Sequence, residues 1–255
     1  MNTLFWLTDD LRLEDNPALV NAAQDDTLTI IFCIDEQAFR TDKFGNLGMG
    51  ALRWKFVQES LLDLQKGLAK HEQTLNLLSG KPSGVLNDLL QAGRFDRVVR
   101  TRQHNSNELL VWQYLRDKFP AVLFDEYDSS TLYPMSAVCF TQSFPATFSQ
   151  FRRSLDAVAF RKVVHAPERL PAPLEFKLDS LALQTPSQSS IPHGGSSAGR
   201  KHVDAYFGTL AASTYKETRN DLSGEHSSTG FSSWLAHGCI SPTQIFYWLG
   251  QYESI

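Results

Sequence analysis

Short apolar runs alternate with longer amphipathic stretches through the first half of the chain. The run at 28–34 has the length and continuity of a buried strand, whereas 50–71 repeats its leucines every three or four residues, as a helix with one buried face does. The predicted strands are 4–7, 28–34, 75–78, 95–99 and 121–124. This alternation predicts a Rossmann-like, doubly wound, five-stranded parallel sheet with helices between its strands.

The pattern changes after residue 125. A helix is predicted at about 144–157, with Phe148, Phe151 and Leu155 on its inner face. Residues 165–200 are rich in Pro, Ser and Gly, a composition that buries no core of its own and is typical of a linker lying over a surface.

Apolar residues return at helical spacing after residue 200. A region of this length with short helices has little core of its own, so we expect it to pack on the α/β part or to belong to a larger helical domain. We therefore expect an α/β domain over 1–127, a linker over 128–200 with its one helix, and a short all-helical segment over 201–255.

A hydroxyl-rich stretch precedes one of these helices. Residues 227–230 stand directly before Phe231, Trp234 and Leu235, which predicts a helix start capped by a Ser or Thr side chain. A helix N-terminus with additional hydroxyl donors also suits a phosphate or another anion. An ordinary cap and an anion site are both consistent with the local sequence. Trp234 and Trp248 are expected to pack in the core.

Composition describes an ordinary globular protein of 255 residues, 42% hydrophobic and 20% charged. The net charge of −4 gives no overall basic surface for nucleic acid, so DNA binding should be weak and lost at moderate salt. The small basic group that includes Arg152, Arg153, Arg161 and Lys162 is expected to be a solvated face.

Cys33, Cys139 and Cys239 lie far apart, without the spacing of a metal site, and each is expected to be a reduced, buried thiol. The N-terminus lacks the basic and apolar regions of a signal peptide, and no apolar run has the length of a membrane span. We expect a cytoplasmic monomer. Neither a Gly-x-Gly-x-x-Gly fingerprint after the first strand nor a phosphate-binding P-loop is present.

Four blocks of the sequence occur in an order typical of one protein family. They are 6–19, 53–64 with 80–82, 144–155, and the motifs within 215–242. Together they resemble the photolyase/cryptochrome family, and most closely its DASH cryptochrome branch. The resemblance covers nearly the whole chain, and the last block is its most specific part.

The resemblance implies an α/β domain, a wrapping linker and a helical domain that holds FAD. It implies deoxyribodipyrimidine photo-lyase activity, by light-driven electron transfer from reduced FAD to pyrimidine dimers in single-stranded DNA, or light sensing, often with a folate antenna. The family's flavin-phosphate motif matches 228–232, and its cofactor-packing tyrosine matches Tyr215. The candidate cofactor-binding residues are Tyr215, Ser228, Thr229, Gly230, Phe231 and Ser232.

The chain departs from the family pattern at several places. Gly230 stands where the motif usually has Arg or Lys, Thr8 replaces an arginine, and Gln103 replaces an antenna-contacting glutamate, which argues against a folate. Residue 255 precedes the family's segments for the rest of the flavin and for most of the DNA surface. We therefore expect the 255-residue chain to be truncated, to lack complete FAD and DNA sites, and to be inactive alone. The alternatives are a non-catalytic α/β module that binds an antenna or nucleotide-like ligand, and a ligand-free remnant.

Overall fold

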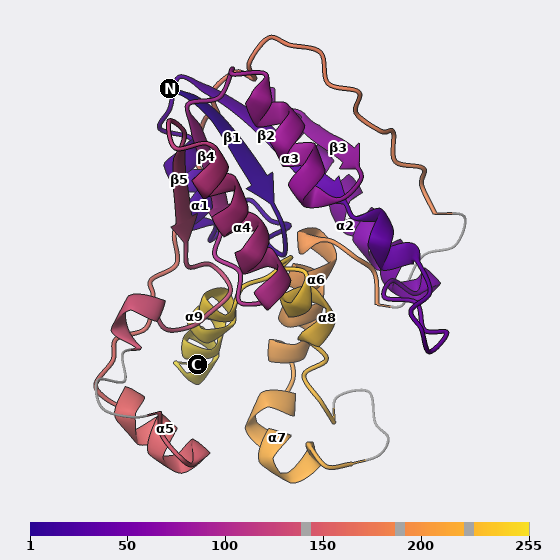
Figure 1. Cartoon of the computed structure of the whole chain (residues 1–255). Coiled ribbons are helices and arrows are strands. Elements are labelled where there is room, and N and C mark those ends of the chain that lie inside the picture. Colours follow the sequence, from indigo (N-terminus) through magenta and orange to yellow (C-terminus); the bar gives the residue numbers. More distant parts are fainter. Residues whose placement is uncertain (139–143, 187–191, 222–226, 255) are drawn as a thin grey trace.

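The computed structural model describes residues 1–138, 144–186, 192–221 and 227–254. Five parallel strands form one sheet in the order β3-β2-β1-β4-β5 (Figure 1). The strands are β1 (Asn2–Leu7), β2 (Thr27–Ile34), β3 (Leu75–Ser79), β4 (Arg97–Thr101) and β5 (Leu123–Tyr127). The predicted doubly wound five-stranded sheet is confirmed.

Helices connect the strands and then follow the sheet. They are α1 (Pro17–Ala22), α2 (Ala51–Ala69), α3 (Pro82–Gln91), α4 (Ser106–Lys118), α5 (Phe148–Leu155), α6 (Ser196–Phe207), α7 (Ala211–Thr218), α8 (Ser232–Ala236) and α9 (Pro242–Glu253). Short 3₁₀ turns occur at Glu36–Phe39 and Met135–Ala137. No helix among the described residues is long and apolar enough to cross a membrane.

The side chains of β1 divide the core into two layers. Phe5 and Leu7 pack with buried residues of α1 and α2 on one face of the sheet, whereas Leu4 and Trp6 pack with those of α3 and α4 on the other. Because successive strand residues point to opposite faces, a continuous apolar run fits a strand covered on both sides.

Charged residues explain why the fourth and fifth strands were predicted too early. Arg97 and Arg100 lie within β4 and are buried. Asp125 accepts from Arg97 Nε at 2.7 Å, and Glu126 accepts from Arg100 Nη2 at 2.6 Å, so the charges pair between neighbouring strands. Pairing makes burial of these charges tolerable, and an apolar pattern does not reveal it.

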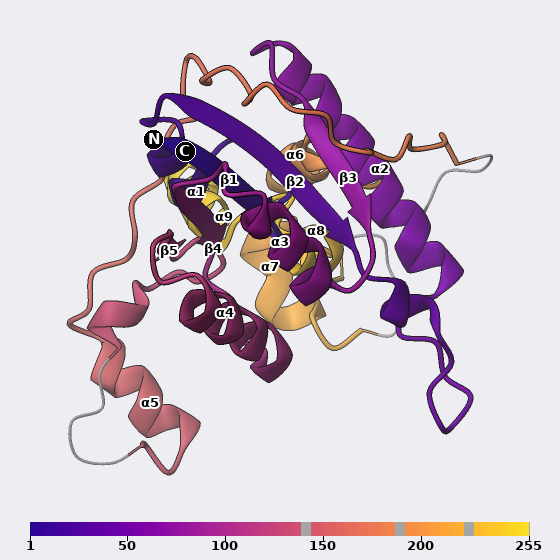
Figure 2. The same ribbon diagram turned by 45° about the horizontal axis from the view of Figure 1, so that its top comes forward.

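The linker follows the sheet closely in its described part. Leu28 of β2 donates its N–H to the carbonyl of Ala172 at 3.0 Å, and Leu181 donates to the carbonyl of Leu77 in β3 at 2.8 Å. The segment crosses above the strands in Figure 2. These contacts tie a segment of linker composition to the α/β core.

Two helix boundaries differ from the predicted ones. Helix α5 begins at Phe148, not at 144, because the Thr147 side chain accepts from the N–H of Gln150 and caps it. Phe148 is 76% exposed, so its predicted inward position is wrong, whereas Leu155 is buried. Figures 1 and 2 both show α5 set apart from the sheet.

Helix α6 begins at Ser196, inside the stretch assigned to the linker. Its first turn is held by side chains of α2: Ser60 accepts from the N–H of Gly195 at 2.9 Å, and Asp63 accepts from the N–H of Ser197 at 3.0 Å. These capping partners are distant in sequence, so the local Gly and Ser content predicted a linker instead.

The helices after α6 lie beside the carboxyl end of the sheet (Figure 1). The residues after α8 make the contact: Leu11 donates its N–H to the carbonyl of His237 at 3.2 Å. Trp234 is buried against Phe56 of α2, which confirms its expected role in the core. Trp248 is half-buried and packs against the same core.

Candidate functional site

The loop before α8 does not have the predicted cap. Phe231 is the N-cap residue of α8, and no side chain bonds the first turn of the helix. Gly230, at φ +64°, turns the chain immediately before this helix, and none of the preceding hydroxyls caps its first N–H groups. Ser228 and Ser232 are exposed. Residues 222–226, which lead into the loop, lie outside the described part of the chain.

Helix α6 contacts this loop through His202. The Nε2 atom of His202 lies 2.8 Å from the carbonyl oxygen of Thr229. The His202 ring also stacks on Trp234, with centroids 4.8 Å apart. The loop is therefore fixed to α6 by a polar contact and an aromatic contact.

Two tyrosines lie close to the same region. Tyr215 of α7 is 38% exposed, whereas Tyr206 of α6 is buried and its hydroxyl has no hydrogen-bond partner among the described residues. Burial, and then the nearby hydroxyls of Tyr215 and Tyr252, raise the pKa of Tyr206. The hydroxyl is consequently protonated at neutral pH and is a buried donor without an acceptor.

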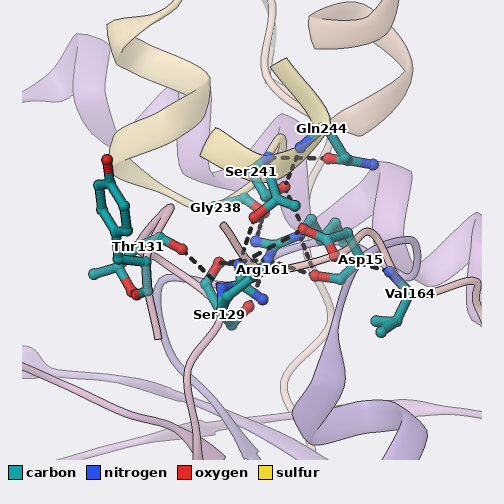
Figure 3. Close-up of polar contacts among 11 residues, drawn as sticks. Asp15, Ser129, Thr131, Arg161, Val164, Gly238, Ser241 and Gln244 are labelled. Atoms are coloured by element: carbon teal, nitrogen blue, oxygen red, sulfur yellow. Dashed lines mark hydrogen bonds and ion pairs between the residues drawn. The ribbon is translucent and has the colours of Figure 1, made fainter. Parts of the chain in front are cut away.

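A buried polar cluster joins three parts of the chain that are far apart in sequence (Figure 3). We define it as Arg12, Asp15, Ser129, Arg161 and Ser241. The Ser241 hydroxyl donates to the Asp15 carboxylate, and Arg161 Nη2 lies 3.8 Å from the same oxygen. Asp15 also accepts from the N–H of Val164 at 3.1 Å. The carboxylate thus contacts both the linker and the start of α9.

Arg12 binds backbone carbonyls within the polar cluster. Its guanidinium donates to the carbonyl oxygens of Asp15 at 2.8 Å, Ser129 at 2.9 Å and Gly238 at 2.9 Å. Burial lowers the pKa of Arg12, and the carboxylates of Asp15 and Asp10 oppose that shift. A planar guanidinium with several donors suits a point where three chain segments meet.

The sequence interpretation missed the polar cluster. Arg161 was assigned to a solvated basic face, but its side chain is only 9% exposed and donates to the hydroxyl of Thr243 at 2.8 Å and the carbonyl of Thr131 at 2.8 Å. Charge alone does not distinguish a solvated arginine from a buried one. The available signal was the Asp-Leu-Arg turn in the first block, which carries Arg12.

A cavity of about 620 Å³ lies at the carboxyl ends of β1 and β2. This is the edge at which an open α/β sheet usually binds ligands. Aromatic and charged side chains share its wall: they include Trp6, Trp54, Phe39, Arg53, Asp35 and Glu108. The cavity therefore presents both stacking surfaces and polar groups.

Two departures from the family pattern meet next to this cavity. Gln103 donates through Nε2 to the hydroxyl of Thr8 at 2.6 Å and to the carbonyl of Thr101 at 3.2 Å. Thr8 lines the cavity, and Gln103 is buried behind it. This part of the wall is a neutral hydrogen-bonded pair. Glu108 also lines the cavity, and burial followed by the nearby Asp9 carboxylate raises its pKa.

The two cysteines that the structure describes belong to no metal site. Cys239 is buried and Cys33 is half-buried, both as free thiols, while Cys139 lies outside the described residues. Burial raises the pKa of Cys239. Across the described ranges, no group of three or more His, Cys, Asp or Glu side chains has an arrangement that would hold a metal ion.

The parallel sheet, the long linker and the helices at its carboxyl edge define a two-part α/β and helical protein. The family model for DNA photolyase matches residues 3–173. The chain therefore belongs to the DNA photolyase family.

Relatives extend the similarity across the whole chain. Cryptochrome DASH of Idiomarina loihiensis is 34% identical over 98% of this chain and 57% of its own length. Cryptochrome DASH of Arabidopsis thaliana, a chloroplastic or mitochondrial protein, is 34% identical over 98% of this chain and 47% of its own length. This chain spans about half the length of the curated relatives it matches.

Solved structures share the fold. A Synechocystis cryptochrome superposes with a TM-score of 0.90 at 28% identity, covering 99% of this chain and 56% of that one. A class III photolyase from Agrobacterium tumefaciens superposes with a TM-score of 0.79 at 23% identity, covering 96% of this chain and 52% of that one, which is a likeness of fold.

Proposed function

We propose that this chain is the α/β part and the first helices of a DASH-type cryptochrome or photolyase. In this proposal residues 228–232 receive the phosphates of FAD, and Tyr215 packs beside the cofactor. The observation that carries the proposal is the similarity to DASH cryptochromes over 98% of the chain, which includes this loop. The expected substrate of the longer family members is pyrimidine-dimer DNA.

The residues at the loop fit the phosphate end of a flavin nucleotide. Ser228 and Ser232 present exposed hydroxyls, and the first N–H groups of α8 receive no side-chain cap. Hydroxyl and backbone N–H donors are the groups that bind phosphate oxygens.

In the proposed site, the residues of this chain bind and orient the cofactor. Bound FAD supplies the light-driven electron transfer, and the protein positions it and tunes its surroundings. The loop donors hold the anionic end, while the partly exposed face of Tyr215 offers a surface for packing. With these groups open to solvent, we expect residues 1–255 to bind FAD reversibly and to lose it during gel filtration.

Titration of FAD into the purified chain tests the proposal, with flavin fluorescence as the readout. The double variant Ser228→Ala/Ser232→Ala should weaken binding, because it removes both exposed hydroxyls. Ser213→Ala, an exposed serine on α7, is the matched control and should leave the affinity unchanged. Equal affinities for all three proteins would contradict the role of the two hydroxyls. A stoichiometric flavin band that survives gel filtration would contradict the expected reversible binding.

A second candidate function is ligand binding in the cavity at the sheet edge. The cavity of about 620 Å³ and its aromatic wall favour an antenna or nucleotide-like molecule. A photolyase from Sulfolobus tokodaii is described as holding two FAD molecules, with a novel light-harvesting cofactor implied. The neutral Thr8–Gln103 pair puts no carboxylate at position 103, which weighs against a folate here. If a flavin binds in the cavity, its fluorescence should be quenched, and Trp54→Leu should relieve the quenching. Identical quenching in that variant would contradict this assignment.

A further inference from the structure

The contact between His202 and the loop has a defined donor and acceptor. A carbonyl oxygen only accepts, so Nε2 of His202 carries the hydrogen in the 2.8 Å contact to Thr229. The ring has little freedom to leave this position. It stacks on Trp234 at an interplanar angle of 27° and meets Phe231 edge-on at 89°.

The backbone at Gly230 passes close to the same histidine. Its φ of +64° is in the left-handed region, where a side chain is strained. A Cβ at this position would also lie 3.1 Å from Nε2 of His202, closer than an ordinary contact. The absent side chain and the imidazole therefore belong to one arrangement, in which the loop passes directly over the ring.

Trp234 is itself held firmly in place. Its Nε1 donates to the carbonyl of His193 at 3.0 Å, and a Cβ at Gly199 of α6 would lie 2.9 Å from its ring. The indole therefore packs directly on the α6 backbone, and His202 stacks on a ring that these contacts anchor. The contact to Thr229 transmits that fixed position to the loop.

We propose that His202 is the positioning residue of the 228–232 loop, and that Gly230 is required for its approach. His202 does not contact the ligand in this assignment, because its Nε2 hydrogen already bonds Thr229. It fixes the backbone that carries the hydroxyls of Ser228 and Ser232. The inference rests on the proposed flavin-phosphate role of the loop, and it accounts for the lack of a side chain, and so of a cation, at position 230.

Two substitutions separate the hydrogen bond from the ring. His202→Phe retains an aromatic ring on Trp234 and removes the donor, whereas His202→Gln retains an N–H donor. In flavin-free protein, His202→Phe should speed amide exchange at 229–235 by about 2- to 12-fold, the range expected for one net hydrogen bond. It should weaken FAD binding by a similar factor, and His202→Gln should restore part of both. The exposed His165→Phe is the control and should change neither.

The outcomes distinguish the two proposals. Faster exchange in His202→Phe that is confined to the loop, with an unchanged urea midpoint, supports His202 as a positioning residue. This holds even if wild type binds no FAD, because the absence of FAD binding would contradict only the proposed function. Unchanged exchange at 229–235 overturns the inference. Equally faster exchange throughout the chain also overturns it, because His202 would then contribute only to global stability.

Discussion

Asp15 is the residue on which the docking of the helical segment should depend most. Its carboxylate is fully buried, accepts from the Ser241 hydroxyl and the Val164 N–H, and faces the Arg161 guanidinium. Asp15→Asn removes the charge and retains an amide oxygen. Asn also tolerates the backbone at φ +51°, so the variant isolates the electrostatic contribution from the backbone strain.

The expected loss of unfolding free energy follows from these contacts. A hydrogen bond to a charged group contributes roughly 1.5–3 kcal/mol, and Asn weakens the one from Ser241. Removing one partner of a buried ion pair costs about 3–5 kcal/mol. The Arg161 contact is long, at 3.8 Å, and this arginine keeps three other acceptors, so the lower end applies. We expect Asp15→Asn to lower the free energy of unfolding by about 3 kcal/mol.

Urea unfolding at neutral pH measures this loss, and amide exchange locates it. The neighbouring Glu14→Gln is the matched control: Glu14 is exposed, and its contact to the Ala166 N–H survives in an amide, so the change should stay within about 0.5 kcal/mol. Exchange in Asp15→Asn should rise most in α9, which begins beside Ser241. A loss no larger than that of Glu14→Gln would show that the buried carboxylate does not hold the segments together.

Other substitutions test close approach and charge elsewhere. Gly238→Ala should destabilise the chain severely, since φ is +60° and a Cβ would lie 2.1 Å from the Asp9 carbonyl oxygen; Gly250→Ala, with open space in α9, should instead raise the urea midpoint slightly. Desolvation raises the pKa of Asp25, but hydrogen bonds from Thr3 and an arginine outweigh it and lower the pKa overall. A lowered pKa stabilises the fold above the unfolded value of about 3.9, so the stability difference between wild type and Asp25→Asn should shrink between pH 7 and pH 3. A constant difference in urea midpoint across that range would contradict this assignment.

The sheet was predictable chiefly from β1 and β2, whose apolar runs are buried on both faces. A run such as 28–34, short and rich in β-branched residues, is typical of a strand between two helical layers, and β2 occupies Thr27–Ile34. Prediction failed where tertiary partners decide the outcome. Helix α6 begins at Ser196 because Ser60 and Asp63 of α2 bond its first turn, and no local pattern contains those residues.

The candidate site was only partly predictable for the same reason. The stretch 227–232 has the composition of a phosphate-binding helix start, but the hydroxyl cap expected from it is absent at α8. Its real support is His202, which precedes it on another helix. A lone histidine in an amphipathic helix carries no signal for such a role. In the sequence, Gly230 indicated only a missing cation; its left-handed φ and its close approach to His202 appear in the structure alone.

The loop and the sheet are connected more tightly than their separation in sequence suggests. Helix α8 has five residues, far fewer than the roughly 12–15 that give even a marginal isolated helix, so its orientation must come from tertiary contacts: those of Trp234 in its middle and those at its two ends. His202 holds the end next to Thr229, and Arg12 holds the other through the carbonyl of Gly238. Arg12 lies in the turn that leaves β1. The α/β part therefore helps to orient the candidate cofactor loop, and a change in the turn after β1 should reach the loop through α8.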